Sequence, residues 1–338
     1  MDQLTSQLQV FFKTDQFEIA QLDGGASSRK YYKLDFAEKL YFPETQIVLM
    51  TVPVKEMKTL TDYMHIDFYL TRMGIPTPKV YEMKRQFGWI FLEYQDLPTL
   101  NDYLIGQHEK ASDVIASLID FLILMQERCQ FEENCPAFQR SFDVKKYQYE
   151  FEFHVRERLL SRYFNHDLSE AELKIFNSFS TEISKTLDID TKIFVHGDFR
   201  SSNIFYDGSS EDMPFKIIDF QDARSGSPIY DLVSCLWDSS IPITEDTRQQ
   251  LSKKFFNHLT KSGTTLSKEK FQKLADYTVI QRKLREAGAL ASSFHRTKEE
   301  GFTSFIHPAI QMAIDKMKGY DSFNEMCSIF QHLGENQQ

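Results

Sequence analysis

Hydrophobic and polar residues alternate along the first 92 positions in patterns that predict both strands and helices. Apolar, β-branched and aromatic runs predict strands at residues 28–34, 47–52 and 89–93. Residues 60–73 have helical spacing and are followed by Gly74, a residue type that is common just after a helix end. The Ile-Pro-Thr-Pro sequence at residues 75–78 then requires an extended backbone. This part of the chain is expected to form a small, mostly antiparallel α+β lobe.

Helical patterns dominate the chain beyond residues 94–98, which have the composition of a linker. Residues 113–126 are apolar on nearly all sides, which predicts a buried helix. A second helix is expected at residues 145–164, where an amphipathic stripe recurs at intervals of four, at Tyr147, Phe151, Val155 and Leu159. The C-terminal part is again helical in pattern. The sequence therefore predicts two lobes, residues 1–97 with a hinge near residues 93–98, and residues 98–338.

Composition and charge limit the class of protein. The chain has 338 residues and a formal net charge of −10, which argues against a nucleic-acid surface. The N-terminus lacks the pattern of a signal peptide, and the most apolar run, residues 114–125, is too short to span a bilayer. The four cysteines have no metal-binding spacing. We expect a cytoplasmic enzyme that binds neither nucleic acid nor membrane.

One segment carries the pattern of a phosphoryl-transfer centre. His196-Gly197-Asp198 follows a short apolar strand at residues 193–195, and Asn203 comes five residues after Asp198. Two further short strands, residues 204–206 and 215–218, are separated by turn residues and end at Asp219. This hairpin is expected to bring Asn203 and Asp219 side by side, next to Asp198. The order of these residues is typical of a kinase catalytic loop and its metal-binding motif.

Phosphoryl transfer explains why these residue types are needed. Asp198 would orient the acceptor hydroxyl and take its proton. The carboxamide of Asn203 and the carboxylate of Asp219 offer the oxygen ligands that Mg²⁺ prefers. The expected cofactors are therefore ATP and Mg²⁺. Together with the two-lobe pattern, the motif predicts a bilobal protein-kinase-like fold, with a small antiparallel sheet in the N-terminal lobe and a mostly helical C-terminal lobe.

The phosphate-binding part of the nucleotide site is less distinct. Gly24 and Ser27 lie in a candidate phosphate-covering loop, in which glycine lets the backbone approach phosphate closely. Met50 stands where protein kinases place a strand lysine, so the cation must come from elsewhere; Arg29 is the first choice, with Lys30 and Lys33 as alternatives. Asp62 and Asp67 could replace the partner glutamate of that lysine. Glu93 and Tyr94, at the linker, are further candidate nucleotide contacts.

Candidate acceptor contacts surround the motif in the sequence. Asp222 could contact a second metal or the acceptor, or could cap the next segment. Arg200 could reach a phosphate oxygen or remain solvated. Glu150 and His154, one helical turn apart, are interpreted as polar groups that face the acceptor. His196 could act as a base or hold the loop, and Asp231 is expected to hydrogen-bond the loop backbone.

The motifs resemble those of the aminoglycoside phosphotransferase and choline kinase-like superfamily. Two segments carry the resemblance, HGDFRSSNIFY from residue 196 and IIDFQDARSGSPIYDL from residue 217. The Asp-Phe-Gln-Asp-Ala form of residues 219–223 and the Gly-x-Ala-Ser-x-Arg-x-Tyr loop of residues 24–31 are similar to bacterial anomeric kinases of N-acetylmuramate and N-acetylglucosamine. Gln281-Arg282 matches a C-terminal run of that group, which also has Met in the third strand. The resemblance covers roughly residues 20–300.

The resemblance implies a function more specific than kinase. The acceptor would be the anomeric hydroxyl of an N-acetylated amino sugar in cell-wall recycling, and a nucleotidyltransferase would be a downstream partner. Residues 281–285 and 294–296 follow the group only in part. An aminoglycoside or choline-type acceptor is therefore the alternative, and a nucleotide-binding regulator without turnover is a second alternative. Intact Asp198, Asn203 and Asp219 argue against the regulator.

Overall fold

The structure is a computed structural model that describes residues 2–22, 29–39, 41–53, 56–210 and 212–335. The chain divides into two compact units. The first contains Met1–Pro98 and Ile204–Asp222, and the second contains Thr99–Asn203 and Ala223–Gln338. Residues 204–222 thus return to the N-terminal unit, which the sequence prediction did not include. The assignment of nucleotide to one part and acceptor to the other stays a prediction.

An antiparallel sheet forms the centre of the first unit. Its strands are β1 (Phe17–Leu22), β2 (Lys30–Phe36), β3 (Gln46–Thr51), β4 (Val80–Lys84) and β5 (Trp89–Glu93). Their order in the sheet is β1-β2-β3-β5-β4, and every neighbouring pair is antiparallel. Tyr31 of β2 pairs with Met50 of β3, which in turn pairs with Ile90 of β5. The predicted antiparallel N-terminal sheet is confirmed.

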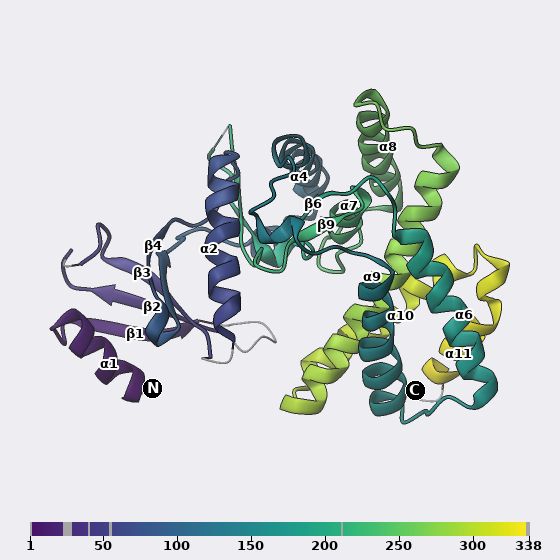
Figure 1. Ribbon diagram of the computed structural model, residues 1–338, viewed down its shortest axis with the longest axis horizontal. Coiled ribbons are helices and arrows are strands. Elements are labelled where there is room, and N and C mark those ends of the chain that lie inside the picture. The colour runs from purple at the N-terminus through teal and green to yellow at the C-terminus, as the bar shows by residue number, and fades with distance from the viewer. Residues whose placement is uncertain (1, 23–28, 40, 54–55, 211, 336–338) are drawn as a thin grey trace. The chain divides into compact units, whose positions relative to one another are not determined.

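Each face of this sheet is covered by a helix. Side chains alternate between the faces of a strand, so Tyr32, Leu34 and Leu49 lie on one face, where they form a core with Leu8 of helix α1 (Asp2–Phe12). Helix α2 (Met57–Arg72) lies on the other side of the sheet (Figure 1). The short helix η2 (Arg85–Phe87) joins β4 to β5.

A second hairpin belongs to the same unit. Strands β7 (Ile204–Tyr206) and β8 (Phe215–Ile217) are antiparallel, with Ile204 opposite Ile217. The backbone N–H of Tyr206 donates to the carbonyl of Pro98 at 3.0 Å, and that of Ile217 donates to the carbonyl of Pro76 at 3.0 Å. These backbone bonds connect the hairpin to the segments around β4 and the linker.

The second unit is mostly helical. Its helices are α3 (Leu100–Leu104), α4 (His108–Arg128), η3 (Pro136–Phe138), α5 (Val144–Glu150), η4 (Phe151–Tyr163), α6 (Glu170–Leu187), η5 (Ser201–Asn203), α7 (Ile229–Leu236), α8 (Glu245–Lys261), α9 (Lys268–Thr297), η6 (Glu300–Phe302), α10 (Thr303–Met317), η7 (Asp321–Phe323) and α11 (Asn324–Glu335). Two short strands, β6 (Ile193–Val195) and β9 (Arg224–Gly226), pair in antiparallel fashion. No helix among the described residues is both long enough and apolar enough to cross a membrane.

Helix α9 packs against η4, α10 and α7. A side chain at Gly288 of α9 would place its Cβ 2.0 Å from the carbonyl oxygen of His154 in η4, so the two backbones approach too closely for any residue except glycine. The predicted helix at residues 145–164 exists as an α-helix followed by a π-helix, η4. The predicted amphipathic stripe is buried, and both its first residue, Tyr147, and its last, Leu159, have 0% exposure.

Candidate active site

The loop that carries Asp198 is held by a buried carboxylate at the start of α7. Asp231 accepts hydrogen bonds from the backbone N–H of His196 at 2.7 Å and from that of Gly197 at 3.1 Å. Burial raises the pKa of Asp231, and the nearby His196 ring and these two bonds oppose that effect. Gly197 has a φ of +88°, which only glycine adopts easily. Asp231 therefore has the scaffolding position that its place in the sequence indicates.

His196 also supports the loop. It is 1% exposed, and its Nδ1 accepts a hydrogen bond from the backbone N–H of Asp198 at 3.2 Å. Helix η5 follows, and its first residue, Ser201, donates through both its backbone N–H and its hydroxyl to Asp238, at 2.8 and 2.6 Å. The buried groups on both sides of Asp198 thus leave its backbone little freedom.

Asp198 and Asn203 are in direct contact. The Asn203 amide group donates to Asp198 Oδ2 at 2.8 Å and to the Asp198 carbonyl at 2.9 Å. These bonds use the NH₂ side of the carboxamide and leave its oxygen for another partner. An oxygen ligand is what the expected metal requires. The donor chemistry of Asn203 therefore fits a magnesium ligand.

Positive charge surrounds Asp198. Arg282 donates to the Gly197 carbonyl at 3.0 Å, and its Nη2 lies 3.4 Å from Asp198 Oδ1. Burial alone would raise the pKa of Asp198, but Arg200, Arg282 and Arg285 outweigh burial and hold that pKa below its ordinary value. Asp198 is therefore ionised at neutral pH.

Arg282 and Arg285 are functional candidates that were not among the predicted site residues. In the sequence, the Gln281-Arg282 run stands out only because it matches a run in the anomeric kinases. Nothing in its spacing shows that Arg282 on α9 reaches the loop of Asp198, 84 residues earlier in the chain. The Arg282 side chain is 11% exposed, and its guanidinium carbon lies 4.7 Å from the centre of the Tyr230 ring. This cation–π contact fixes the guanidinium group beside the loop.

Glu150 lies at the centre of a buried polar network. Its side chain is 2% exposed and contacts Lys146 Nζ at 2.9 Å, Arg285 Nε at 3.3 Å and Gln281 Nε2 at 2.7 Å. Burial would raise the pKa of Glu150, but Arg285 and Lys146 reverse that effect and lower it. The structure thus gives Glu150 a defined partner in Arg285. Its predicted direct contact with an acceptor stays a prediction.

His154 is neutral at pH 7. Burial lowers the pKa of its imidazole to about 4, and nearby Arg285 adds to that effect. Its Nδ1 is buried and has no hydrogen-bond partner among the described residues. Within those residues, no group of three or more His, Cys, Asp or Glu side chains is arranged to hold a metal ion. The contact of His154 with an acceptor stays a prediction.

Arg200, a candidate contact for phosphate or acceptor, lies beside Asp198. Its Nε donates to Ser202 Oγ at 2.9 Å. Burial alone would lower the pKa of Arg200. The negative charges of Asp198 and Asp238 more than offset burial and raise this pKa above its ordinary value, so the guanidinium stays charged. The structure leaves both predicted roles of Arg200 open.

The metal-motif carboxylate of the first unit is paired with a cation. Arg29 Nη2 lies 2.8 Å from Asp219 Oδ1, and the Arg29 side chain is 10% exposed. Asp219 has a φ of +65°, a strained value for a residue with a side chain. Gln221 Nε2 donates to Asp219 at 3.1 Å and to Asp222 at 3.2 Å, so one amide bridges the two carboxylates. Arg29, Asp219 and Asp222 therefore form one cluster.

The other predicted nucleotide contacts have mixed outcomes. Gly24 and Ser27 lie outside the described residues. Glu93 accepts hydrogen bonds from the Lys79 backbone N–H at 3.1 Å and from Lys216 Nζ at 3.2 Å. Tyr94 lies under the ammonium group of Lys33, 4.5 Å from the ring centre. Nucleotide contact by Glu93 and Tyr94 stays a prediction.

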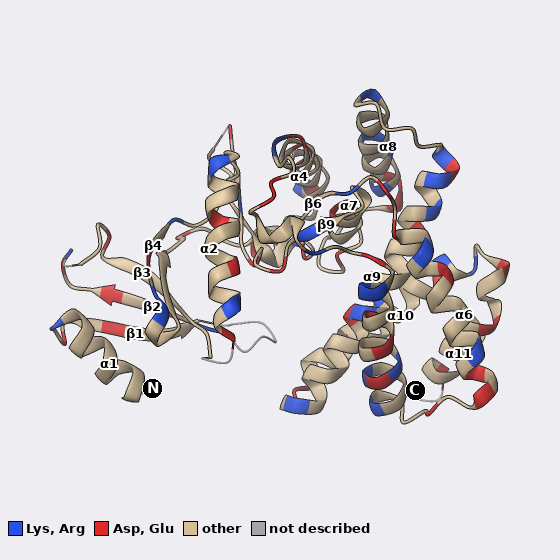
Figure 2. Ribbon diagram, viewed as in Figure 1, with Lys and Arg blue, Asp and Glu red and all other residues tan. Residues whose placement is uncertain are grey.

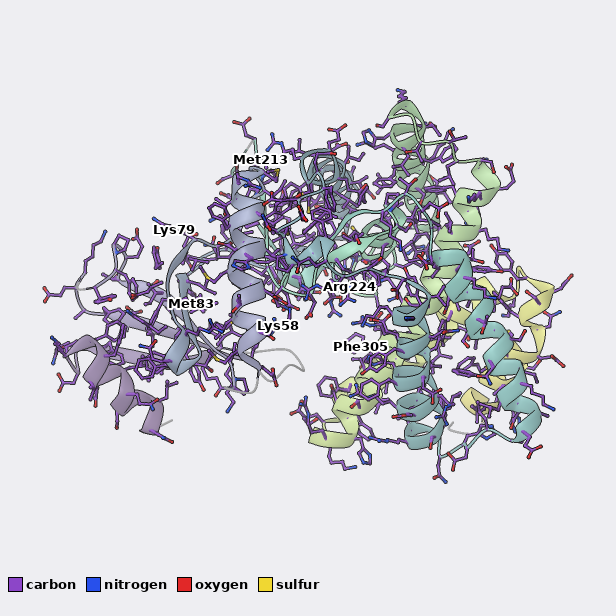
Figure 3. The ribbon with its side chains drawn as sticks, in the orientation of Figure 1. Lys58, Lys79, Met83, Met213, Arg224 and Phe305 are labelled. Carbon is purple, nitrogen blue, oxygen red and sulfur yellow. The ribbon has the colours of Figure 1, made fainter. Side chains whose placement is uncertain are left out.

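The acidic residues of α2 are engaged locally. Lys58, labelled on α2 in Figure 3, contacts Asp62 at 2.7 Å. Asp67 accepts a hydrogen bond from the Thr77 hydroxyl at 2.7 Å. Met50 is fully buried. Arg29, the first choice for the cation in place of a third-strand lysine, reaches Asp219, and its contact with phosphate stays a prediction.

The structure brings the predicted residues together in two groups. Asp198 and Asn203 lie in the second unit, and Arg29, Asp219 and Asp222 lie in the first. The hairpin on which the sequence argument rests is present as β7 and β8. The predicted approach of Asn203 to Asp219 stays a prediction. A loop aspartate, a carboxamide and a second aspartate after a hairpin define the residue set of a phosphotransferase of the kinase type.

The comparison with known families agrees with this class. The chain matches the phosphotransferase enzyme family over residues 18–261, which include all three motif residues. It belongs to that family. The prediction of a phosphotransferase with an alcohol acceptor is confirmed at this level.

Two bacterial proteins are similar over most of the chain. An N-acetylmuramate/N-acetylglucosamine kinase of Neisseria meningitidis is 21% identical over 303 residues, 88% of this chain and 85% of that protein. A protein of the same name from Pseudomonas aeruginosa is 22% identical over 282 residues, 82% of this chain and 78% of that protein. These similarities confirm the resemblance drawn from the motifs.

The fold is shared with solved kinases. The structure of choline kinase LicA from Streptococcus pneumoniae has a TM-score of 0.61 and 15% sequence identity, and the match covers 94% of this chain and 99% of that one. At this identity the likeness concerns the fold alone. It confirms the predicted protein-kinase-like fold class.

Proposed function

We propose that the protein is an ATP- and Mg²⁺-dependent kinase that phosphorylates the anomeric hydroxyl of an N-acetylated amino sugar, N-acetylmuramate or N-acetylglucosamine. The names of the two bacterial relatives support this acceptor. So does the match of residues 219–223 and 24–31 to the anomeric kinases. A kinase that uses the cellular ATP pool in this way would act in the cytoplasm.

The observation that carries the proposal is the charge around Asp198. Arg200, Arg282 and Arg285 together lower the pKa of this one carboxyl group. A polycationic aminoglycoside or a quaternary ammonium acceptor would have to bind beside the guanidinium groups of Arg200 and Arg282, and like charges repel. A neutral sugar, or one with a carboxylate, has no such penalty. The charge pattern therefore favours an amino sugar whose nitrogen is acetylated.

The acceptor hydroxyl would be positioned by Asp198. Oδ2 of this carboxylate holds the Asn203 amide at 2.8 Å, while Oδ1 has Arg282 at 3.4 Å, beyond the range of a strong hydrogen bond. Oδ1 therefore retains the capacity to accept a hydrogen bond from the acceptor. A carboxylate with a lowered pKa is a weak base, so its main contribution is to orient the hydroxyl and to accept the proton late in the transfer.

Mg²⁺ would be held by the amide oxygen of Asn203 and by the carboxylate of Asp219. When bound, this metal neutralises charge on the phosphate groups. Arg29 would contribute positive charge on the phosphate side. The product would be a sugar 1-phosphate, a substrate class of nucleotidyltransferases. An enzyme of that class is the proposed downstream partner.

An acceptor panel tests the proposal. Release of ADP is measured with N-acetylmuramate, N-acetylglucosamine, an aminoglycoside and choline, each with ATP and Mg²⁺. Turnover of at least one N-acetylated sugar with kcat/KM at least about 100-fold above the cationic acceptors is expected, a difference of about 2.7 kcal/mol. Preference for the aminoglycoside or for choline would contradict the proposal.

A further inference from the structure

A pocket of about 260 Å³ lies in the second unit, among η4, α9 and α10. It is lined by Arg158, Arg162, Tyr163, Ala291, Ser292, Phe294, His295 and Thr303. Neither the catalytic loop nor the Glu150 network contributes to its lining. It is therefore distinct from the group of residues around Asp198.

Helix α9 sets the separation between the two places. Arg282, near its middle, contacts Asp198, and Ser292, ten positions further along, lines the pocket. An α-helix rises about 1.5 Å per residue, so about 15 Å of helix separates them. A monosaccharide is shorter than this. The pocket lining on α9 is thus set apart from the residue of the same helix that contacts Asp198.

Two guanidinium groups stand on the η4 side of the pocket. The Arg158 guanidinium carbon lies 3.9 Å from the centre of the Phe153 ring, which anchors this side chain. Among the described residues, no carboxylate forms an ion pair with Arg158 or Arg162 within 4.0 Å. By contrast, Arg156 on the same helix pairs with Glu152.

The charges of the pocket repel each other. Burial lowers the pKa of Arg158, and the positive charges of Arg162 and Arg296 lower it further, against the opposing effects of Tyr149 and Glu157. In Figure 2, η4 carries both basic and acidic residues, and basic residues stand at the C-terminal end of α9. An anion between Arg158 and Arg162 would relieve this repulsion and form charge-assisted hydrogen bonds.

The rest of the lining is apolar with a few hydroxyl groups. The rings of Tyr163 and Phe294 meet edge to face, with centres 6.3 Å apart, and Ala291 is buried beside them. Ser292 and Thr303 add hydroxyl groups. Phe305, labelled in Figure 3, is 49% exposed on α10, two residues beyond Thr303. A pocket with an apolar wall and a few polar groups is typical of a small-molecule site.

We propose that this pocket binds a small anionic molecule, whose carboxylate or phosphate group lies between Arg158 and Arg162 and whose less polar part packs against Tyr163 and Phe294. The site is an addition to the proposed kinase centre and does not depend on the identity of the acceptor. Carboxylate and phosphate share the chemistry that a guanidinium pair recognises.

The test is a binding titration by NMR at low ionic strength, with inorganic phosphate and with glutarate as probes. A non-hydrolysable ATP analogue and Mg²⁺ fill the nucleotide site, so that phosphate cannot report on it. The double variant R158Q/R162Q removes both charges. R156Q is the matched control, because it removes a charge from the same helix outside the pocket. S292F fills the pocket and keeps both charges.

The wild type and R156Q should bind at least one probe, and R158Q/R162Q should bind it about tenfold more weakly or not at all. S292F should weaken binding too, which keeps the proposal testable if the double variant folds poorly. Binding of phosphate alone or glutarate alone would identify the preferred anion. Equal binding by all four proteins, or no binding to the wild type, would overturn the proposal.

Discussion

Arg29 Nη2 lies 2.8 Å from Asp219 Oδ1, so a buried guanidinium group neutralises the carboxylate that is expected to hold the metal. Burial alone would lower the pKa of Arg29. Asp219, Tyr31 and Asp222 more than offset burial and raise this pKa above its ordinary value, so Arg29 stays charged at all pH values of interest. Mg²⁺ held by Asp219, as proposed, would therefore compete with Arg29 for the same carboxylate. Binding of MgATP would resolve the competition if Arg29 turned to a phosphate oxygen.

Replacement of Arg29 tests this exchange. Arg29→Ala should weaken the binding of ATP much more than the binding of adenosine, because the proposed contact is to phosphate. We expect the affinity for ATP to fall roughly tenfold or more. Arg29→Lys keeps the charge and should be affected less. Equilibrium titration of both ligands measures the difference. Equal losses for ATP and adenosine would mean that Arg29 only supports the cluster around Asp219.

Asp198→Asn should lower kcat by about 10² or more while nucleotide affinity stays near that of the wild type. The variant keeps the shape of the side chain but loses the negative charge that would orient the acceptor hydroxyl. Steady-state kinetics with the best acceptor, together with an ATP titration, separate these effects. A near-normal kcat would remove Asp198 from the mechanism.

The pH profile should respond to Arg282. This guanidinium helps to lower the pKa of Asp198, so wild-type Asp198 stays ionised until the pH falls below the ordinary carboxyl range. Arg282→Gln removes one positive charge, which should raise that pKa and move the acid limb of kcat/KM to higher pH. Arg282→Lys keeps the charge and should leave the limb closer to its original position. An acid limb that is the same in all three proteins would contradict the assignment.

The metal requirement should depend on two residues. Asp219→Ala and Asn203→Ala should each raise the Mg²⁺ concentration needed for half-maximal rate, and Asp219→Ala should raise it more because Asp219 supplies a charge and Asn203 only a dipole. Rates at graded Mg²⁺ and fixed ATP measure this. An unchanged requirement in both variants would refute the predicted pairing of Asn203 with Asp219.

Asp67 should make stability depend on pH. Burial raises its pKa to about 6, and the Thr77 hydrogen bond opposes that effect. The folded state therefore holds a proton that the unfolded state releases at lower pH, and stability falls as the pH rises from about 4 to about 6. A shift of about two units corresponds to about 3 kcal/mol.

Asp67→Asn mimics the protonated carboxyl group and keeps an oxygen for the Thr77 hydroxyl. It should stabilise the protein by roughly 1–3 kcal/mol at pH 7.5 and by much less at pH 4. Asp62→Asn is the control on the same helix, because it removes the charged partner of Lys58 and should not stabilise. Urea unfolding at both pH values measures the difference. No gain for Asp67→Asn at pH 7.5 would contradict the raised pKa.

The local features of the fold could be predicted because they have short-range signals. The strand patterns, the Gly74 signal and the turn residues between β7 and β8 all act within a few positions of the elements they predict. The N-terminal helix α1 was not predicted, although Leu4, Leu8 and Phe11 have helical spacing. The pattern of apolar residues also does not indicate that η4 is a π-helix rather than an α-helix.

The candidate site could be predicted only in part. Asp198, Asn203 and Asp219 lie within 22 residues of one another, so their motif is visible in the sequence. Arg282 reaches Asp198 through the packing of α9 on η4 and α7, which depends on Gly288 and on the Tyr230 ring. The periodicity of α9 does not indicate which of its basic residues meets the loop. Tertiary packing decided that contact.

The most direct measurement of the central claim compares two sugars that differ at one position. N-acetylglucosamine or N-acetylmuramate has a free anomeric hydroxyl, and its methyl glycoside lacks only that group. The enzyme should phosphorylate the free sugar, ignore the methyl glycoside, and give an acid-labile 1-phosphate with no reducing end, which ³¹P NMR identifies. Phosphorylation of the methyl glycoside at a comparable rate would contradict transfer to the anomeric hydroxyl.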